Sequence, residues 1–240
     1  GKSTLIKILI GKTLPVDGTI KWQKGVKIGY LDQYVDIPAG MTLIDFLHTA
    51  FTELYQLNDQ MNKLYADYAE KMDDELLTRA GRIQEKLDAN NFYEIETEVE
   101  RVMNGLGLTD IGKDHVVSEM SGGQRSKIIL AKMLLENPDV ILLDEPTNYL
   151  DTAHIEWLID YLNDFDGAAM IISHDYDFLE QVTNTICDVS FGKITKYRGS
   201  FQQAMRQKEE RKEAQEREYE KQQVVIEKAQ RFIRKNKAGS

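Results

Sequence analysis

The chain has few cysteines and no long hydrophobic run, and these two absences limit the classes of protein that it can belong to. Its single cysteine, Cys187, excludes a disulfide framework within the 240 residues and is typical of a reducing compartment. No segment reaches the ~18 consecutive apolar residues that a membrane-spanning helix requires, and no charged-then-apolar leader precedes a cleavage site. With 42% hydrophobic residues available for a core, the sequence predicts a soluble, cytoplasmic protein with no membrane partner.

The net charge of −10 is unevenly distributed along the chain. Residues 198–240 hold 12 Lys and Arg against 7 Asp and Glu, whereas residues 1–197 hold 18 against 33. Within 221–237, six basic side chains accompany a single acidic one, Glu227. An acidic body and a locally basic end indicate two surfaces that suit different partners.

Helical periodicity dominates the first half of the chain. We expect an opening helix at about 2–11 and then a β-hairpin at 18–33, where GTIKWQKGVKIGYLDQ alternates around a central Lys-Gly turn. From Thr42 to about Gly105, apolar residues recur every three or four positions, and Gly105 and Gly107 are helix stop signals. This region therefore predicts an all-helical insert between two α/β pieces.

Strands and helices alternate in the second half. The runs 140–143 and 168–172 are continuously apolar, which favours strands of a parallel sheet that are buried on both faces. The alternation predicts right-handed crossovers and a doubly wound layer. The expected elements are helices at 122–136, 152–164 and 176–184, strands at 139–145 and 168–173, short strands at 186–192 and 193–199, and a charged helix from about Ser200.

The first four residues, Gly1, Lys2, Ser3 and Thr4, stand where a helical pattern begins. They fit the end of G-x-x-x-x-G-K-[ST], in which backbone N–H groups and the helix dipole hold phosphates. In that pattern the lysine reaches the terminal phosphates and the first hydroxyl, here Ser3, ligates Mg²⁺. Four residues alone do not establish such a site.

Two acidic residues end the apolar strand in VILLDEPTN. The strand brings Asp144 to the carboxyl edge of the sheet, where ligands bind in open α/β folds and where a carboxylate can hold Mg²⁺ or its waters. Glu145 can orient or deprotonate an attacking water. The alternative, a strand that ends in two solvated acids, is the better interpretation of the pair taken alone, and it loses support once Lys2 and Ser3 are considered.

The stretch MSGGQRSKIIL places a hydroxyl and bare backbone amides at the positive end of a helix, which forms a second anion site. A flexible loop is the alternative. The four residues Ser121, Gly122, Gly123 and Gln124 resemble the signature of the ATP-binding cassette family, about 20 residues before the Asp144 and Glu145 pair, as that family requires. The resemblance implies a P-loop NTPase core that uses ATP and Mg²⁺.

Three more positions resemble conserved parts of that family. Gln33 resembles the glutamine that senses Mg²⁺ and the attacking water, which makes it both a catalytic and a metal candidate. Asp151 resembles the aspartate that communicates across the dimer. His174, 29 residues after Glu145, resembles the switch histidine near the γ-phosphate; a satisfied core or capping histidine is the alternative.

Three features resemble the ABC-F branch, whose members carry two cassettes in one chain and act on ribosomes. The wording LLDEPTNYLD is typical of that branch, although many members have His where Tyr149 stands. The 88 positions between Gln33 and Ser121 leave room for a helical arm at about 50–95. The charged helix from Ser200 resembles the start of the interdomain linker, which in ABC-F proteins contacts the ribosome and transfer RNA.

The basic end of that helix suits contact with RNA, because its side chains could neutralise several phosphates with an affinity that falls as salt rises. A solvated charged helix is the alternative, and it describes 209–220 well because the i,i+4 charges there largely balance. The candidate RNA-binding residues are Lys228, Arg231, Arg234, Lys235 and Lys237.

The resemblance implies the following organisation. The start of the ATPase core occupies 1–41, a helical subdomain with its arm occupies 42–120, the signature helix and the rest of the core occupy 121–199, and an incomplete linker occupies 200–240. Cassettes of this family bind ATP between the phosphate loop of one domain and the signature of another. The chain would then hold two half-sites for a second cassette and be nearly inactive alone.

The expected function is an ATPase of the ABC-F type, a translation factor or a ribosome-protection factor of the kind linked to antibiotic resistance. One alternative is the ATPase subunit of a membrane transporter, with the helical region docking a membrane partner. Another is a module that binds nucleotide without turnover, which the intact Asp144, Glu145 and His174 disfavour.

Overall fold

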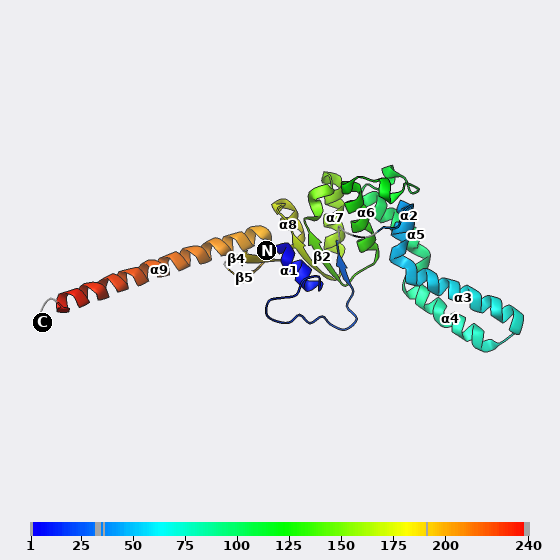
Figure 1. The fold of residues 1–240 in the computed structure, drawn as a ribbon, viewed down its shortest axis with the longest axis horizontal. Coiled ribbons are helices and arrows are strands. Elements are labelled where there is room, and N and C mark those ends of the chain that lie inside the picture. Colours follow the sequence, from blue (N-terminus) through cyan, green and yellow to red (C-terminus); the bar gives the residue numbers. More distant parts are fainter. Residues whose placement is uncertain (1, 32–34, 36, 191, 238–240) are drawn as a thin grey trace. The chain divides into compact units, whose positions relative to one another are not determined.

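A computed structural model of the chain describes residues 2–31, 35, 37–190 and 192–237. It divides into two compact units, Gly1–His174 and Asp175–Ser240, called unit 1 and unit 2 below. Figure 1 gives the order of the helices and strands along the chain. Of the helices in the described ranges, none is both long enough and apolar enough to cross a membrane.

Unit 1 is built on a parallel sheet of three strands, β1 (Ile28–Tyr30), β2 (Val140–Asp144) and β3 (Ala168–Ile172), in the order β1-β2-β3. The central strand β2 is buried on both faces, since its three middle residues are at most 1% exposed. The predicted parallel pairing of these runs is therefore confirmed. The predicted burial is wrong for the start of β3, because Ala168 and Ala169 are exposed in this edge position.

Helices cover both faces of this sheet. On one face, α1 (Lys2–Leu9) contributes Ile6 to a cluster with Leu142 and Ile172. On the other face, α6 (Gly122–Leu135) approaches β1 so closely that a Cβ added at Gly29 would lie 2.6 Å from Met133 Sδ. Layers on both faces of a parallel sheet make the doubly wound α/β arrangement that the sequence predicts.

The predicted β-hairpin at 18–33 is wrong. Lys24 and Gly25 do form a turn, with Gly25 at φ +88°, but no strand precedes that turn in the described part of the chain. The segment after the turn pairs in parallel with β2 instead, and the Lys27 N–H donates to Asp139 Oδ2 at 2.8 Å. Pairing with a strand that is buried on both faces removes more apolar surface from water than a local hairpin would. The segment therefore pairs with β2 and not with the residues before the turn.

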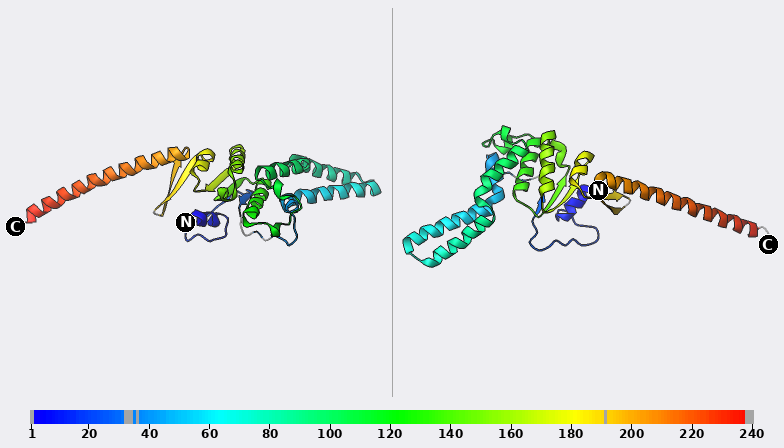
Figure 2. Two further views of the ribbon diagram at one scale, coloured as in Figure 1. Left: turned by 90° about the horizontal axis from the view of Figure 1, so that it is seen from above. Right: turned by 180° about the vertical axis from the view of Figure 1, so that it is seen from behind.

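The region after β1 is helical, as predicted. Helices α3 (Thr52–Lys71) and α4 (Asp74–Ala89) pack side by side as the arm of unit 1, with Met61, Ala80 and Leu87 in its core (Figures 1 and 2). Met72, in the left-handed conformation, ends α3, and the Asp73 side chain caps α4. The helices of this region are α2 (Leu43–His48), α3 (Thr52–Lys71), α4 (Asp74–Ala89) and α5 (Ile95–Gly105), with short 3₁₀ turns at Thr49–Phe51, Phe92–Glu94, Thr109–Ile111 and Val117–Glu119.

The predicted stop signal at the end of α5 is confirmed. Gly107 adopts φ +66°, its N–H donates to Asn104 O, and the Leu108 N–H donates to Met103 O at 2.8 Å. This pair of hydrogen bonds is a Schellman motif, which satisfies the last carbonyl groups of the helix. Unit 1 is completed by a 3₁₀ turn at Pro146–Tyr149 and by α7 (Thr152–Asp164).

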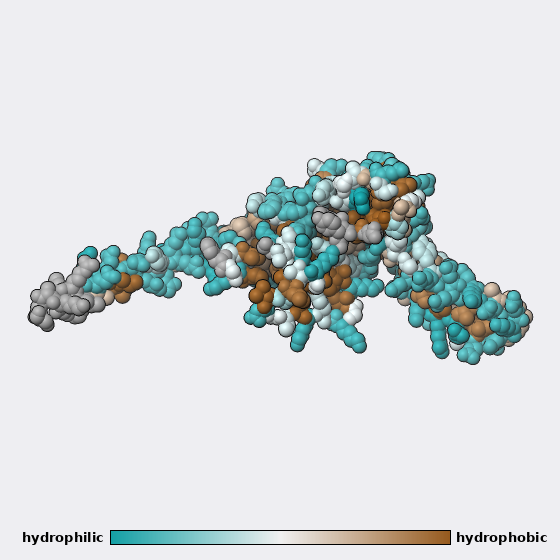
Figure 3. Space-filling view, in the orientation of Figure 1, coloured by the Kyte–Doolittle hydropathy of each residue, from teal (hydrophilic) through white to brown (hydrophobic). Residues whose placement is uncertain are grey.

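Unit 2 contains the two short strands that the sequence predicts, β4 (Thr185–Ser190) and β5 (Lys193–Arg198), and they pair as a small antiparallel element. It also contains α8 (Tyr176–Val182) and the charged helix α9 (Phe201–Lys237). The first turns of α9 pack within the unit, since Ala204 is fully buried and Lys208 Nζ lies 2.9 Å from Asp188 Oδ1. From 208 to 231 every residue is exposed, and Figure 3 shows a mostly hydrophilic surface there.

Candidate functional site

Strands β2 and β3 end side by side, and the residues that follow them form the candidate site. Asp144, the last residue of β2, pairs in register with Ile172, the last residue of β3. The Glu145 N–H donates to Ile172 O at 2.8 Å, so the segment after β2 stays hydrogen-bonded to the end of β3 for one residue beyond β2. This is the carboxyl edge of a parallel sheet, where ligands bind in open α/β folds.

Glu145 and His174 meet at this edge. Glu145 Oε2 accepts a hydrogen bond from the His174 N–H at 3.2 Å, and Glu145 Oε1 lies 3.6 Å from His174 Nε2. The His174 side chain is 76% exposed, and Asp175 caps α8, so His174 is neither a core nor a capping histidine. Glu145 adopts φ 51°, a left-handed conformation that is costly for a residue with a side chain and that is frequent at functional sites.

The beginning of α1 is exposed at Lys2, Ser3 and Thr4. These residues lie one helical turn, about 6 Å, before Ile6, which packs against Leu142 and Ile172 near the ends of β2 and β3. The helix start is thus near the carboxyl edge, where a lysine and a hydroxyl could reach a phosphate group. Of the other predicted site residues, Gly1 and Gln33 lie outside the described residues.

Ser121 and Gln124 begin α6 with a capping box. The Ser121 N–H donates to Gln124 Oε1 at 2.9 Å, and Ser121 Oγ accepts from the Gln124 N–H at 3.3 Å. The N–H groups of Gly122 and Gly123 belong to the same first turn, where N–H groups have no carbonyl partner within the helix. Backbone donors therefore remain there for an anion.

The fold of unit 1 does not itself require the two glycines. A Cβ added at Gly122 would meet nothing within 4 Å, and one added at Gly123 would meet Tyr149 Cδ1 at 3.5 Å, an ordinary contact. Neither residue has a positive φ. Neither packing nor backbone conformation therefore calls for glycine at these two positions, and the bare backbone leaves the first-turn amides open to the close approach of a ligand.

Asp151 begins α7 as its capping residue. Its Oδ1 accepts from the His154 N–H at 3.1 Å and lies 2.8 Å from His154 Nδ1. The ring of His154 occupies the space that a Cβ on Gly107 would need, 2.2 Å from Cε1. His154 was not a sequence candidate, although an aspartate followed by a histidine three positions later is a spacing at which the two side chains can meet.

The residues at the carboxyl edge fit the needs of a nucleotide with Mg²⁺. In the described part of the chain, no group of three or more His, Cys, Asp or Glu side chains is arranged to hold a metal ion. Nucleotide-bound Mg²⁺ needs only one or two protein oxygens besides phosphates and waters, and Asp144 supplies a carboxylate at the strand end. Asp144 and Ser3 are therefore sufficient as candidate ligands.

The five candidate RNA-binding residues of α9 divide into two groups. Lys228 and Arg231 are exposed, and Arg231 Nη2 lies 3.9 Å from Glu227 Oε2. The backbone of Arg234, Lys235 and Lys237 belongs to α9, and their side chains are outside the described part of the structure. The proposed RNA contacts of all five residues stay predictions.

Comparison with protein families and curated proteins gives consistent matches. Residues 1–148 and residues 187–240 match two family models, both described as ABC transporter. The chain is 44% identical over 241 residues to the uncharacterized ABC transporter ATP-binding protein YfmM of Bacillus subtilis, covering 99% of this chain and 46% of that protein. It is 33% identical over 213 residues to the energy-dependent translational throttle protein EttA of Escherichia coli K12, covering 88% of this chain and 38% of EttA.

Solved structures show the same fold at low identity. An ATP-binding subunit of an ABC transporter matches with a TM-score of 0.59 at 19% identity, over 86% of this chain and 77% of that one. The archaeal ribosome recycling factor aABCE1, in complex with the ribosomal stalk protein aP1, matches with a TM-score of 0.56 at 22% identity. The match covers 85% of this chain and 33% of the aABCE1 chain.

The chain spans less than half the length of these curated relatives. A family model nevertheless covers more than half of the chain, from 1 to 148, and the curated relatives align with nearly all of it. The chain belongs to the ABC transporter ATP-binding protein family.

Proposed function

We propose that this chain is one cassette of an ATP-hydrolysing protein of the ABC-F type that acts on the ribosome in the cytoplasm. The contact between Glu145 and His174 beside Asp144, at the carboxyl edge of the sheet, is the observation that carries the ATPase part of the proposal. The arm formed by α3 and α4 and the similarity to EttA support the ribosomal part.

ATP with Mg²⁺, when bound, would supply the phosphoanhydride bond that is hydrolysed. Glu145 would orient the attacking water and accept its proton. The His174 N–H holds Oε2 of that carboxylate at 3.2 Å, which limits its rotation, and Oε1, 3.6 Å from His174 Nε2, would accept the proton. Asp144 and the Ser3 hydroxyl would hold the metal, and Lys2 would neutralise charge on the terminal phosphates.

The candidate residues form two half-sites that serve different nucleotides. Lys2, Ser3 and Asp144 would share one ATP with the signature of a second cassette. The first-turn amides of Gly122 and Gly123 would cover the ATP of that cassette. The isolated chain should therefore hydrolyse ATP far more slowly than the full-length protein.

A transporter ATPase is the second candidate function, because YfmM is described as an ABC transporter ATP-binding protein. In that case the helical region from α2 to α5 would dock a membrane partner. Binding without turnover is less favoured, because the residues expected for hydrolysis are present together at the edge of the sheet.

The decisive experiment uses the full-length protein with Glu145→Gln, and Glu156→Gln as a matched control because Glu156 is exposed on α7. We expect phosphate release to fall by ~100-fold or more for Glu145→Gln, since the amide cannot accept the proton, and to be unchanged in the control. Co-sedimentation with ribosomes in the presence of ATP should increase in the Glu145→Gln variant. Unchanged hydrolysis in that variant would exclude the role of Glu145, and copurification with a membrane protein in place of ribosomes would favour the transporter.

A further inference from the structure

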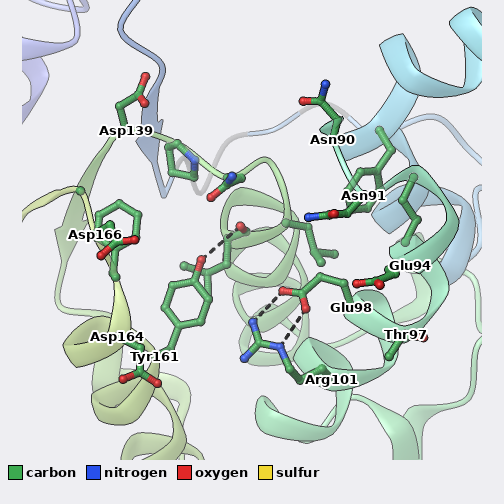
Figure 4. Close-up of a pocket in the computed structure, with 18 of the residues that line it drawn as sticks. Asn90, Asn91, Glu94, Thr97, Glu98, Arg101, Asp139, Tyr161, Asp164 and Asp166 are labelled. Carbon is green, nitrogen blue, oxygen red and sulfur yellow. Dashed lines mark hydrogen bonds and ion pairs between the residues drawn. The ribbon is translucent and has the colours of Figure 1, made fainter. Parts of the chain in front are cut away.

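A groove with a cavity volume of about 780 Å³ lies in unit 1 between α5, α7 and the segments that precede β2 and β3 (Figure 4). Its lining includes Asp139 and Gly167, which come before the two strands, whereas Glu145 comes after β2. Asp139 and Glu145 are six residue steps apart along extended chain, a distance of roughly 20 Å. The groove is therefore at the opposite end of the sheet from the candidate nucleotide site.

The groove is strongly acidic. In Figure 4, Asp164 and Asp166 lie along one wall, and Glu94 and Glu98 lie along the wall opposite. Arg101 is the one basic side chain among the described residues that line it. The lining carboxylates are Glu94, Glu98, Asp139, Asp160, Asp164 and Asp166.

Three aromatic side chains accompany these carboxylates. Trp157 and Tyr161 lie one turn apart on α7, and Phe165 follows at the same spacing as the residue that ends the helix. The ring centroids of Trp157 and Tyr161 are 5.5 Å apart, and those of Tyr161 and Phe165 are 6.5 Å apart at an interplanar angle of 15°. The Tyr161 hydroxyl donates to Leu134 O at 3.3 Å, which fixes the middle ring.

One end of this aromatic row already holds a guanidinium group from the chain itself. Arg101 lies over the rings of Trp157 and Tyr161, 5.7 Å from each centroid. Its Nε and Nη2 donate to the two carboxylate oxygens of Glu98 at 2.8 and 2.6 Å. The hydrogen bond to Glu98 raises the pKa of Arg101 above its ordinary value, and the geometry is that of a guanidinium held by an aromatic face and a carboxylate together.

The other end of the row has an aromatic ring with a carboxylate on either side of it in the chain. Phe165 is half-buried, and the exposed carboxylates of Asp164 and Asp166 are its neighbours on either side in the chain. We propose that this end of the groove docks an arginine-rich segment of a partner protein, with a guanidinium group over Phe165 and paired with Asp164 or Asp166. RNA is the wrong partner for this surface, because six carboxylates against one guanidinium repel phosphates.

The test measures binding of a fluorescein-labelled nona-arginine peptide to the full-length protein by fluorescence anisotropy. The groove variant combines Asp160→Asn, Asp164→Asn and Asp166→Asn. A matched control removes the same charge from exposed carboxylates of the arm, with Asp59→Asn, Glu70→Gln and Glu85→Gln. We expect the groove variant to bind about tenfold more weakly than the unmodified protein and the control to bind nearly as well, because each exposed pair contributes a small, additive share.

A second substitution tests the aromatic contact. Phe165→Leu keeps an apolar side chain and removes the ring face, so binding of nona-arginine should weaken by about threefold. If the triple variant does not fold, Asp166→Asn, in the exposed segment before β3, replaces it with an expected loss of about twofold.

Four results would overturn the proposal. They are no binding of nona-arginine by the unmodified protein, equal losses in the groove variant and the arm control, binding of oligouridine that the groove variant abolishes, and self-association of the protein that the groove variant abolishes. The last would make a second copy of the chain the occupant.

Discussion

Gly122→Ala should leave the folded chain intact and slightly more stable. The Cβ of alanine would meet nothing within 4 Å at this position, and the backbone is already helical there. Alanine restricts the unfolded chain more than glycine does and is the better helix former, so the free energy of unfolding should rise by about 0.5 kcal/mol.

Gly105→Ala is the matched substitution, because Gly105 is also a terminal helical residue without a positive φ. There the added Cβ would lie 2.0 Å from Trp157 Cε2 and 2.2 Å from Trp157 Cδ2, so the indole ring must move. Overpacking of this kind costs about 2 kcal/mol, and the two alanine variants should therefore differ by roughly 2.5 kcal/mol in the free energy of unfolding.

Urea unfolding followed by circular dichroism measures both values on the same chain, and the melting temperatures should differ by roughly 5–10 °C. In the full-length protein, Gly122→Ala should reduce ATP turnover by ~100-fold despite the intact fold, since the methyl group displaces a phosphate from the first-turn amides. If Gly122→Ala lost as much stability as Gly105→Ala, packing would explain both glycines, and the structural reason for an anion site at the start of α6 would disappear.

Two further predictions concern α7. Asp151→Ala should lower the free energy of unfolding by about 1 kcal/mol, because the first turn of α7 loses its capping carboxylate, whereas Asp151→Asn should lose much less since asparagine caps equally well; equal losses in urea unfolding would contradict the capping role. Burial, and to a smaller extent Glu98, raises the pKa of Tyr161, while the nearby Arg101 lowers it, with a net rise. The folded chain then keeps a proton that the unfolded chain loses near pH 10, so stability is complete below that pH and falls as pH rises through the folded pKa. Tyr161→Phe should flatten this alkaline decline, and an unchanged slope in unfolding experiments at pH 9 to 11 would show that Tyr161 does not cause it.

Buried strands and periodic helices could be predicted from the sequence because local composition determines them. The run from Val140 to Leu143 is apolar without interruption, and it became a strand that is buried on both faces. The segment around Lys24 and Gly25 shows where this reasoning fails. The turn formed as its residues predict, but the alternation gives no information about the pairing partner, and Lys27 hydrogen-bonds with Asp139, 112 positions away.

The candidate site divides in the same way. The residue types of Asp144, Glu145 and His174 are visible in the sequence because each stands within two residues of the end of an apolar run. The spacing of Trp157, Tyr161 and Phe165 is equally visible, but a row of aromatic residues on one helix face indicates core packing by itself. The carboxylates on the opposite wall of the groove come partly from α5, and only the tertiary structure brings them opposite α7.

The glycines of unit 1 show how one residue type serves two physical purposes that sequence does not separate. Gly105 and Gly107 end a helix, as predicted, but they also allow close packing, since Trp157 and His154 occupy the space of their missing side chains. His154 in turn lies 2.8 Å from Asp151, so the end of α5 is linked by direct contact to the residue that begins α7. At Gly122 and Gly123, by contrast, no side chain occupies the space of an added Cβ. What an added Cβ would meet thus separates the glycines that the packing of unit 1 needs from those that it does not need.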